Sequence, residues 1–140
     1  MKERRVRFVF AKLGLDDHTR PMFVLTQGLR DAGIEVIYLG LFQTPEQVVK
    51  SAIAEDADAI GLSFHTMHYI GWVGETINLL KQHKAENVCL FVGGVIPEED
   101  IPVLKSAGVK AVFLPGTSME TITSCIKEIV SKERWQVSSR

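Results

Sequence analysis

Short apolar runs, rich in β-branched residues, recur at regular intervals along the chain. They are RVRFVF (5–10), EVIYLG (35–40), DAIGLSF (58–64), NVCLFVGG (87–94) and AVFLPG (111–116). Runs that are apolar at nearly every position are typical of strands that are covered on both faces of a sheet. The pattern therefore predicts five buried strands.

Helical patterns lie between these runs, with apolar residues three or four positions apart. Thr44 followed by Pro45 predicts a capped helix start, and Ser118 predicts another. Residues 97–100, Pro-Glu-Glu-Asp, open a further helix with acids at the positive end of its dipole. The residues predicted to face inward are Met22, Leu25, Leu29 and Ala32; Val48, Val49, Ala52 and Ile53; Val73, Ile77 and Leu80; and Ile122, Ile126, Ile129 and Val130.

Strands that alternate with helices predict an α/β fold with a parallel sheet, right-handed crossovers and helices on both faces. For 140 residues, we expect a flavodoxin-like (Rossmann-like) three-layer sandwich with a five-stranded sheet of order 2-1-3-4-5. That order has a switch point between the first and third strands, where ligands bind outside the carboxyl ends. We expect one domain over residues 1–140, with a core of about 5–131 and a polar, frayed tail at 132–140.

Composition narrows the classes of partner. The formal net charge is −1 and the basic residues are scattered, so we expect no nucleic acid partner. No apolar run approaches the roughly 20 residues that span a bilayer, so we expect no membrane partner. Cys89 and Cys125 lie in apolar stretches and are predicted to be buried free thiols. A cytoplasmic location is therefore expected.

Small and chemically active residues follow four of the predicted strands, and the carboxyl ends of parallel strands meet at one edge. A carboxylate such as Asp16 can orient His18 and raise its basicity, as acids do for metal-ligating histidines. Adjacent glycines allow a bulky ligand to approach the backbone. Each feature also fits an ordinary loop: a solvated histidine, a plain turn or a helix cap. The candidates are Asp16, Asp17 and His18; Ser63, Phe64 and His65; Gly93 and Gly94; and Pro115, Gly116 and Thr117.

Two other kinds of site on this fold fit poorly. A phosphate-accepting receiver domain needs an aspartate after the third strand and a lysine after the fifth, where this chain has Ser63 and Pro115. A flavodoxin needs a phosphate-binding loop after the first strand, and the acidic LGLDDHTRP cannot cradle a phosphate well. No G-x-G-x-x-G or P-loop pattern is present.

Taken together, the segments resemble cobalamin-binding domains of the methylmalonyl-CoA mutase type. That family has D-x-H-x-x-G after its first strand, S-x-L after its third and G-G after its fourth. The sequence around these motifs is also similar to the acyl-CoA mutase branch of the family, and the resemblance covers roughly residues 5–131. The matching segments are AKLGLDDHTR, LRDAGIEVIYLGLFQTPEQVV, AIAEDADAIGLS, VGGVIPEEDI and FLPGTS.

The resemblance implies a role for each candidate residue. His18 would be the lower axial ligand to the cobalt of adenosylcobalamin, in place of the cofactor's own dimethylbenzimidazole. Asp16 would hydrogen-bond His18, and no catalytic residue would lie in this chain. The displaced nucleotide tail would pass the remaining cofactor-binding residues, which are Ser63, His65, Gly93, Gly94, Pro115, Gly116 and Thr117.

The resemblance also implies a partner. The chain has no room for the TIM-barrel part that holds the substrate in such isomerases. It would be the small subunit of an acyl-CoA mutase, resembling those of methylmalonyl-CoA or 2-hydroxyisobutyryl-CoA mutases, and its partner would be a TIM-barrel large subunit that binds acyl-CoA. Trp72 would either anchor that partner or pack in the core.

Two positions depart from the family pattern: Pro21 replaces the glycine and His65 replaces the leucine. The alternative function is therefore a carrier or binding module of the same fold. It would be of the corrinoid methyltransferase type, or would take an altered ligand, with weakened cobalamin binding. His65 and His68 could also form a metal pair if the segment is helical.

Overall fold

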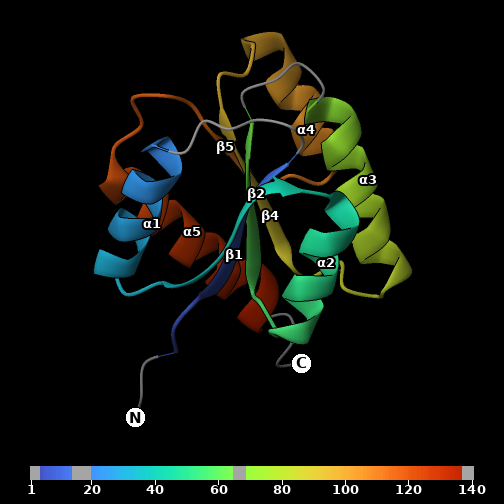
Figure 1. The fold of residues 1–140 in the computed structure, drawn as a ribbon, viewed down its shortest axis with the longest axis horizontal. Helices are drawn as coiled ribbons and strands as arrows, with labels where there is room; N and C mark the ends of the chain where they lie inside the picture. The colour runs from blue at the N-terminus through green and yellow to red at the C-terminus, as the bar shows by residue number, and fades with distance from the viewer. Residues whose placement is uncertain (1–3, 14–19, 65–68, 137–140) are drawn as a thin grey trace.

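The structure, a computed structural model, describes residues 4–13, 20–64 and 69–136 (Figure 1). Within them, five parallel strands form a sheet of order β2-β1-β3-β4-β5, which confirms the predicted fold and topology. The first two strands extend further than predicted and the last is shorter. Their bounds are β1 (Arg7–Leu13), β2 (Glu35–Gln43), β3 (Ala59–Phe64), β4 (Cys89–Gly94) and β5 (Ala111–Phe113).

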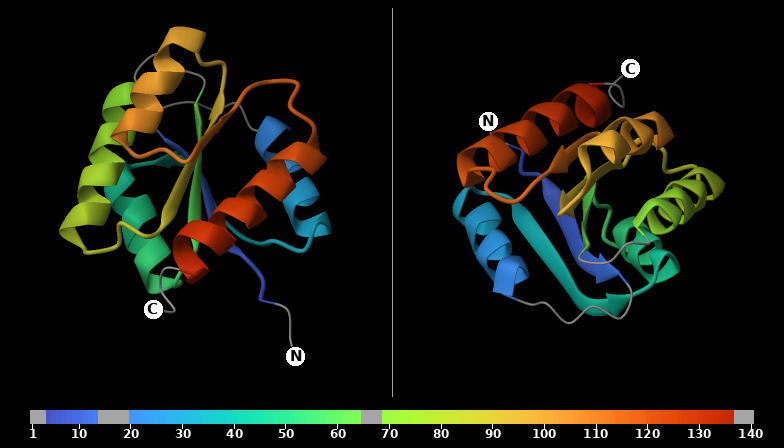
Figure 2. Two further views of the ribbon diagram at one scale, coloured as in Figure 1. Left: turned by 180° about the vertical axis from the view of Figure 1, so that it is seen from behind. Right: turned by 90° about the horizontal axis from the view of Figure 1, so that it is seen from above.

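Helices cover both faces of the sheet, so the molecule has three layers (Figure 2). Helices α1 and α5 lie on one face, and α2, α3 and α4 lie on the other. No helix of the described residues is long and apolar enough to cross a membrane. The bounds are α1 (Arg20–Asp31), α2 (Pro45–Ala54), α3 (Tyr69–Gln82), α4 (Ile101–Ala107) and α5 (Met119–Val130).

The predicted helix starts are confirmed, with one difference. Thr44 caps α2 in a capping box with Gln47, and the Ser118 side chain accepts a hydrogen bond from a backbone N–H in the first turn of α5. The acidic segment before α4 forms a short 3-10 turn, η1 (Glu98–Asp100), and α-helical geometry begins only at Ile101.

The two faces of the sheet bury different kinds of side chain. The face under α2, α3 and α4 is mainly aliphatic, with Ile60, Leu90 and Val92 at its centre. The face under α1 and α5 carries the rings of Phe8 and Phe91. Most of the predicted inward-facing residues lie in one of these two cores.

Burial differs from the prediction most clearly at two positions, Ile53 and Cys125. Ile53 is 43% exposed, because Val49 and Ala52 already occupy the inner side of the last turn of α2. Cys89 is buried as predicted, whereas Cys125 is only half-buried. Trp72 is half-buried against the aliphatic core, so it is neither a fully exposed anchor nor a fully buried core residue.

The beginning of the C-terminal tail is anchored, which corrects the expectation that it frays. Residues Ser131–Trp135 extend α5 by a π-helical turn, η2. The Arg134 Nε and Trp135 Nε1 atoms donate hydrogen bonds to Asp58 Oδ1, at 2.8 Å and 2.9 Å. Asp58 is only 3% exposed. A buried carboxylate is costly unless it is paired. The two hydrogen bonds to Asp58 therefore hold the beginning of the tail against the start of β3.

Candidate functional site

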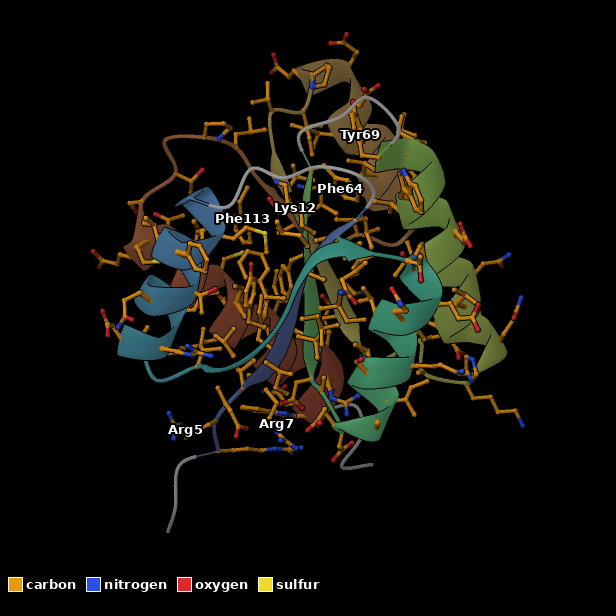
Figure 3. All side chains as sticks on the ribbon, in the orientation of Figure 1. Arg5, Arg7, Lys12, Phe64, Tyr69 and Phe113 are labelled. Atoms are coloured by element: carbon orange, nitrogen blue, oxygen red, sulfur yellow. The ribbon has the colours of Figure 1, made fainter. Side chains whose placement is uncertain are left out.

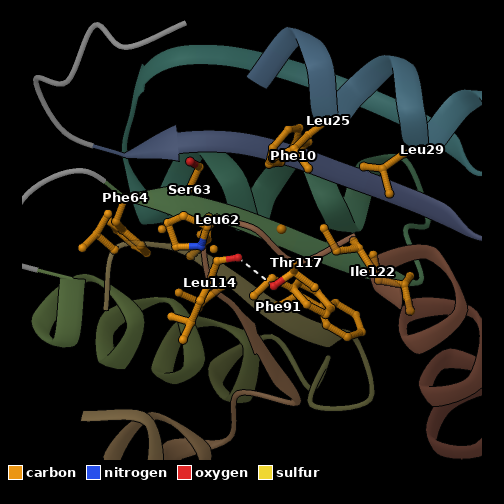
Figure 4. Close-up of a pocket in the computed structure, with 18 of the residues that line it drawn as sticks. Phe10, Leu25, Leu29, Leu62, Ser63, Phe64, Phe91, Leu114, Thr117 and Ile122 are labelled. Atoms are coloured by element: carbon orange, nitrogen blue, oxygen red, sulfur yellow. Dashed lines mark hydrogen bonds between the residues drawn. The ribbon is translucent and has the colours of Figure 1, made fainter. Parts of the chain in front are cut away.

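A cavity of about 440 Å³ lies between the sheet and helices α1 and α5, and it reaches the carboxyl ends of β3 and β4 (Figure 4). This volume falls within the range of about 300–1,000 Å³ that is usual for small-molecule sites. All of the predicted cofactor-binding residues that the structure describes line this cavity. They are Ser63, Gly93, Gly94, Pro115, Gly116 and Thr117.

The other predicted site residues, Asp16, His18 and His65, lie outside the described residues, as does His68. Their assigned roles therefore stay predictions. The strands that precede them in the sequence, β1 and β3, both end at the edge of the sheet where the cavity opens.

The walls of the cavity are apolar and largely aromatic. The rings of Phe91 and Phe113 stack with centroids 5.9 Å apart and an interplanar angle of 15°, and Phe8 lies 6.2 Å from Phe91. Among the described lining residues, Ser63 and Thr117 have the only polar side chains. The Thr117 hydroxyl already donates to the Leu114 carbonyl oxygen at 2.7 Å. The cavity is therefore suited to a flat, apolar group with few polar atoms.

The two glycines of β4 serve different purposes, although the sequence analysis expected both to let a bulky ligand approach the backbone. Gly94 has φ +140°, and a Cβ there would lie 2.3 Å from the Phe64 carbonyl oxygen, so the backbone itself requires glycine. A Cβ at Gly93 would meet only the Phe113 carbonyl oxygen, at an ordinary 3.6 Å. Gly93 therefore leaves space in the cavity that a larger side chain could fill.

Gly61 contributes to the site in a way that sequence reasoning missed. A Cβ at this position would lie 2.3 Å from Cζ of Phe8, so the ring lies directly over the glycine. Both residues line the cavity. The pattern of apolar runs contained both residues, but it did not show that a ring from β1 crosses β3 here.

Lys12 is a further residue that the sequence analysis missed. It is fully buried near the end of β1 and is the register partner of Ser63 on β3. Lysine is almost never fully buried without a compensating interaction, so a buried lysine at this edge of the sheet is a candidate for a role in the site. Figure 3 places Lys12 at the same end of the molecule as Phe64 and Phe113. The available signal was one lysine inside the apolar run VFAKL.

Comparison with known proteins identifies the family. A family model described as "B12 binding domain" matches residues 6–123. The 2-hydroxyisobutanoyl-CoA mutase small subunit of Aquincola tertiaricarbonis is 37% identical over 131 residues, which cover 94% of this chain and 96% of that protein. The pivalyl-CoA mutase small subunit of Xanthobacter autotrophicus is 40% identical over 132 residues, which cover 94% and 88% of the two chains.

A solved structure agrees in fold. A cobalamin-binding protein from Desulfitobacterium hafniense superposes with a TM-score of 0.73 at 20% identity, over 88% of this chain and 58% of that one. At this identity, the likeness shows the fold alone. The sequence matches carry the family assignment, and they agree with the resemblance seen in the motifs. The chain therefore belongs to the B12-binding domain family, in the group that contains the small subunits of acyl-CoA mutases.

Proposed function

We propose that this chain is the cobalamin-binding small subunit of an adenosylcobalamin-dependent acyl-CoA mutase, an isomerase that works with a large subunit. The observation that carries the proposal is the apolar cavity at the carboxyl edge, on which the described candidate residues converge. The relatives that match nearly end to end are small subunits of mutases, which supports the isomerase class. The free thiols suit a reducing cytoplasm.

The described residues fit the nucleotide tail of cobalamin. Its flat base would lie among the rings of Phe91 and Phe113, and the space beside Gly93 would admit it. The Ser63 and Thr117 hydroxyls, together with backbone groups at the strand ends, are available to the polar atoms of the tail. The corrin ring would then lie outside the sheet edge, where His18 would hold the cobalt and Asp16 would orient His18.

When bound, adenosylcobalamin would supply the radical chemistry for the rearrangement of the acyl-CoA. The residues of this chain bind and orient the cofactor. Buried apolar walls exclude water from the base, and an acid on one ring nitrogen of His18 would hold the other nitrogen unprotonated toward the metal.

The large subunit, which we propose is a TIM barrel that binds the acyl-CoA, would cover the carboxyl edge. Val95 and Leu114 line the cavity and are nevertheless 70% and 38% exposed. Near the start of α1, Phe23 and Val24 are 57% and 63% exposed. Exposed apolar side chains gathered beside a cavity are typical of an interface. Val95→Asp should therefore weaken association with the large subunit without unfolding the chain.

Absorption spectroscopy of the purified chain with hydroxocobalamin tests the proposal. We expect the spectrum of a histidine-ligated, base-off cobalamin, and we expect it to be lost in His18→Ala. His83→Ala is the matched control, because His83 is exposed just after the C-terminal end of α3, away from the cavity. No spectral change at saturating cobalamin would contradict cobalamin binding. Methyl transfer without mutase activity, in the presence of the partner, would favour the carrier module.

A further inference from the structure

A partly buried hydrogen bond near the cavity joins the start of α3 to the turn that follows β4. Tyr69 is the first residue of α3 and is 4% exposed. Its hydroxyl donates to the carboxylate of Asp100, the half-buried last residue of η1. This hydrogen bond, together with burial, raises the pKa of Tyr69 to about 12. The hydroxyl therefore remains a protonated donor throughout the physiological pH range.

Phe64, the last residue of β3, connects this bond to the cavity. The ring of Phe64 packs against that of Tyr69, with centroids 6.2 Å apart. Phe64 lines the cavity, and its carbonyl oxygen occupies the place that a Cβ of Gly94 on the next strand would need. Figure 3 shows Phe64 and Tyr69 together at the carboxyl end of the sheet.

The segment that follows β4 runs from Gly94 to Asp100. Val95 lines the cavity, and the next residue, Ile96, is buried in the aliphatic core. The Asp100 N–H donates to the Pro97 carbonyl oxygen at 3.0 Å, which closes the turn. Asp100 is therefore held by its own backbone, and its carboxylate gives Tyr69 a fixed acceptor.

We propose that Tyr69 and Asp100 are positioning residues for the ligand of the cavity. Their hydrogen bond joins the start of α3 to the turn after β4, on the side of the aliphatic core. It holds Phe64, Gly94 and Val95 in the arrangement that admits the ligand. Neither residue belongs to the D-x-H-x-x-G, S-x-L or G-G motifs. A hydroxyl–carboxylate bond is among the stronger hydrogen bonds, and a pre-organised site binds more tightly because less must be ordered on binding. The inference rests on the proposed function, since it takes cobalamin as the ligand.

Titration of the full chain with hydroxocobalamin tests the pair. Tyr69→Phe keeps the ring on Phe64 and removes only the hydroxyl, so we expect the Kd to rise about five- to tenfold. Asp100→Ala should do the same, whereas Asp100→Asn keeps an acceptor and should bind nearly as the wild type does. The double variant Tyr69→Phe/Asp100→Ala should be no weaker than either single variant, because both remove one shared interaction.

Thr76→Val is the matched control for a merely structural effect. Thr76 is fully buried in the same helix, and its hydroxyl donates to the Trp72 carbonyl oxygen at 2.8 Å. This variant should lose stability in urea unfolding and keep the wild-type Kd. An equal rise in Kd for Thr76→Val and Tyr69→Phe would overturn the inference, as would a Tyr69→Phe variant that binds like the wild type. A wild-type chain that does not bind cobalamin would overturn the proposed function and, with it, this inference.

Discussion

The two faces of the sheet are covered by different helices (Figure 2), and they differ in how completely their side chains are packed. The face under α2, α3 and α4 is built from aliphatic side chains such as Ile60 and Leu90. The face under α1 and α5 combines aromatic rings with Gly61 and Gly93, and it holds the cavity. Branched aliphatic side chains interlock at close to crystal density, whereas rigid rings beside missing side chains leave a gap. Room for a ligand thus comes from which residues are small as much as from which are large.

The largest expected effect is on the stability of the aliphatic face. Leu90 is 2% exposed there and does not line the cavity. Leu90→Ala should lower the free energy of unfolding by about 2–5 kcal/mol, because it leaves a void among tightly packed neighbours. Urea unfolding measures this loss. Cobalamin affinity of the folded protein should not change, and a loss below about 1 kcal/mol would show that this face is also loosely packed.

The next effect concerns the face under α1 and α5, which holds the cavity. Gly93→Leu places a side chain in the cavity, and we expect cobalamin affinity to fall about 100-fold, which is about 2.7 kcal/mol. The free energy of unfolding should change little, because the new Cβ meets one atom at 3.6 Å. Titration and urea unfolding of the same preparation check both parts.

Gly94→Ala is the contrasting control for Gly93→Leu. It should destabilise the fold, because its φ of +140° and the Phe64 carbonyl oxygen leave no place for a Cβ. Wild-type affinity in Gly93→Leu would show that the ligand does not use this cavity.

A smaller effect should separate corrinoids that differ in the base of their nucleotide tail. The cavity offers few partners for the ring nitrogens and amino group of an adenine, so some of these would be buried without hydrogen bonds. We expect an adenine-containing corrinoid to bind about tenfold more weakly than cobalamin, a difference of about 1.4 kcal/mol. Competition titration measures the ratio. Leu25→Asn, at a half-buried lining position, should narrow the preference, and equal affinities would show that the base remains outside.

The smallest effect reports how well the core around Cys89, under α1 and α5, excludes water. Burial raises the pKa of the Cys89 thiol from 9.0 to about 11, and burial also raises that of Cys125. Since the folded thiol keeps its proton above pH 9 and the unfolded thiol does not, the stability from Cys89 is complete below pH 9. It is lost as the pH rises toward 11. The loss between pH 8 and pH 9.5 should be on the order of 1 kcal/mol.

Urea unfolding at pH 8 and pH 9.5 measures this loss, and Cys89→Val should remove it. A thiol reagent at pH 8 should modify the half-buried Cys125 well before Cys89. Equal rates would indicate that the face under α1 and α5 opens more readily than its packing suggests.

Local signals in the sequence were enough for the fold and part of the site. The spacing of apolar runs and the caps at Thr44 and Ser118 predicted the order of elements, because each depends on neighbours within a few residues. The rule that parallel strands bring their carboxyl ends together then predicted that Ser63, Gly93 and Thr117 would meet. The family signature predicted the cofactor.

Only the tertiary structure decided which face holds the cavity, since that depends on the Phe8 ring crossing Gly61 from another strand. It also decided that Asp58 anchors Arg134, 76 residues away, and that Tyr69 meets Asp100. These contacts join residues that are distant in sequence and carry no periodic signal. Their energies come from burial and pairing, which exist only after the chain has folded.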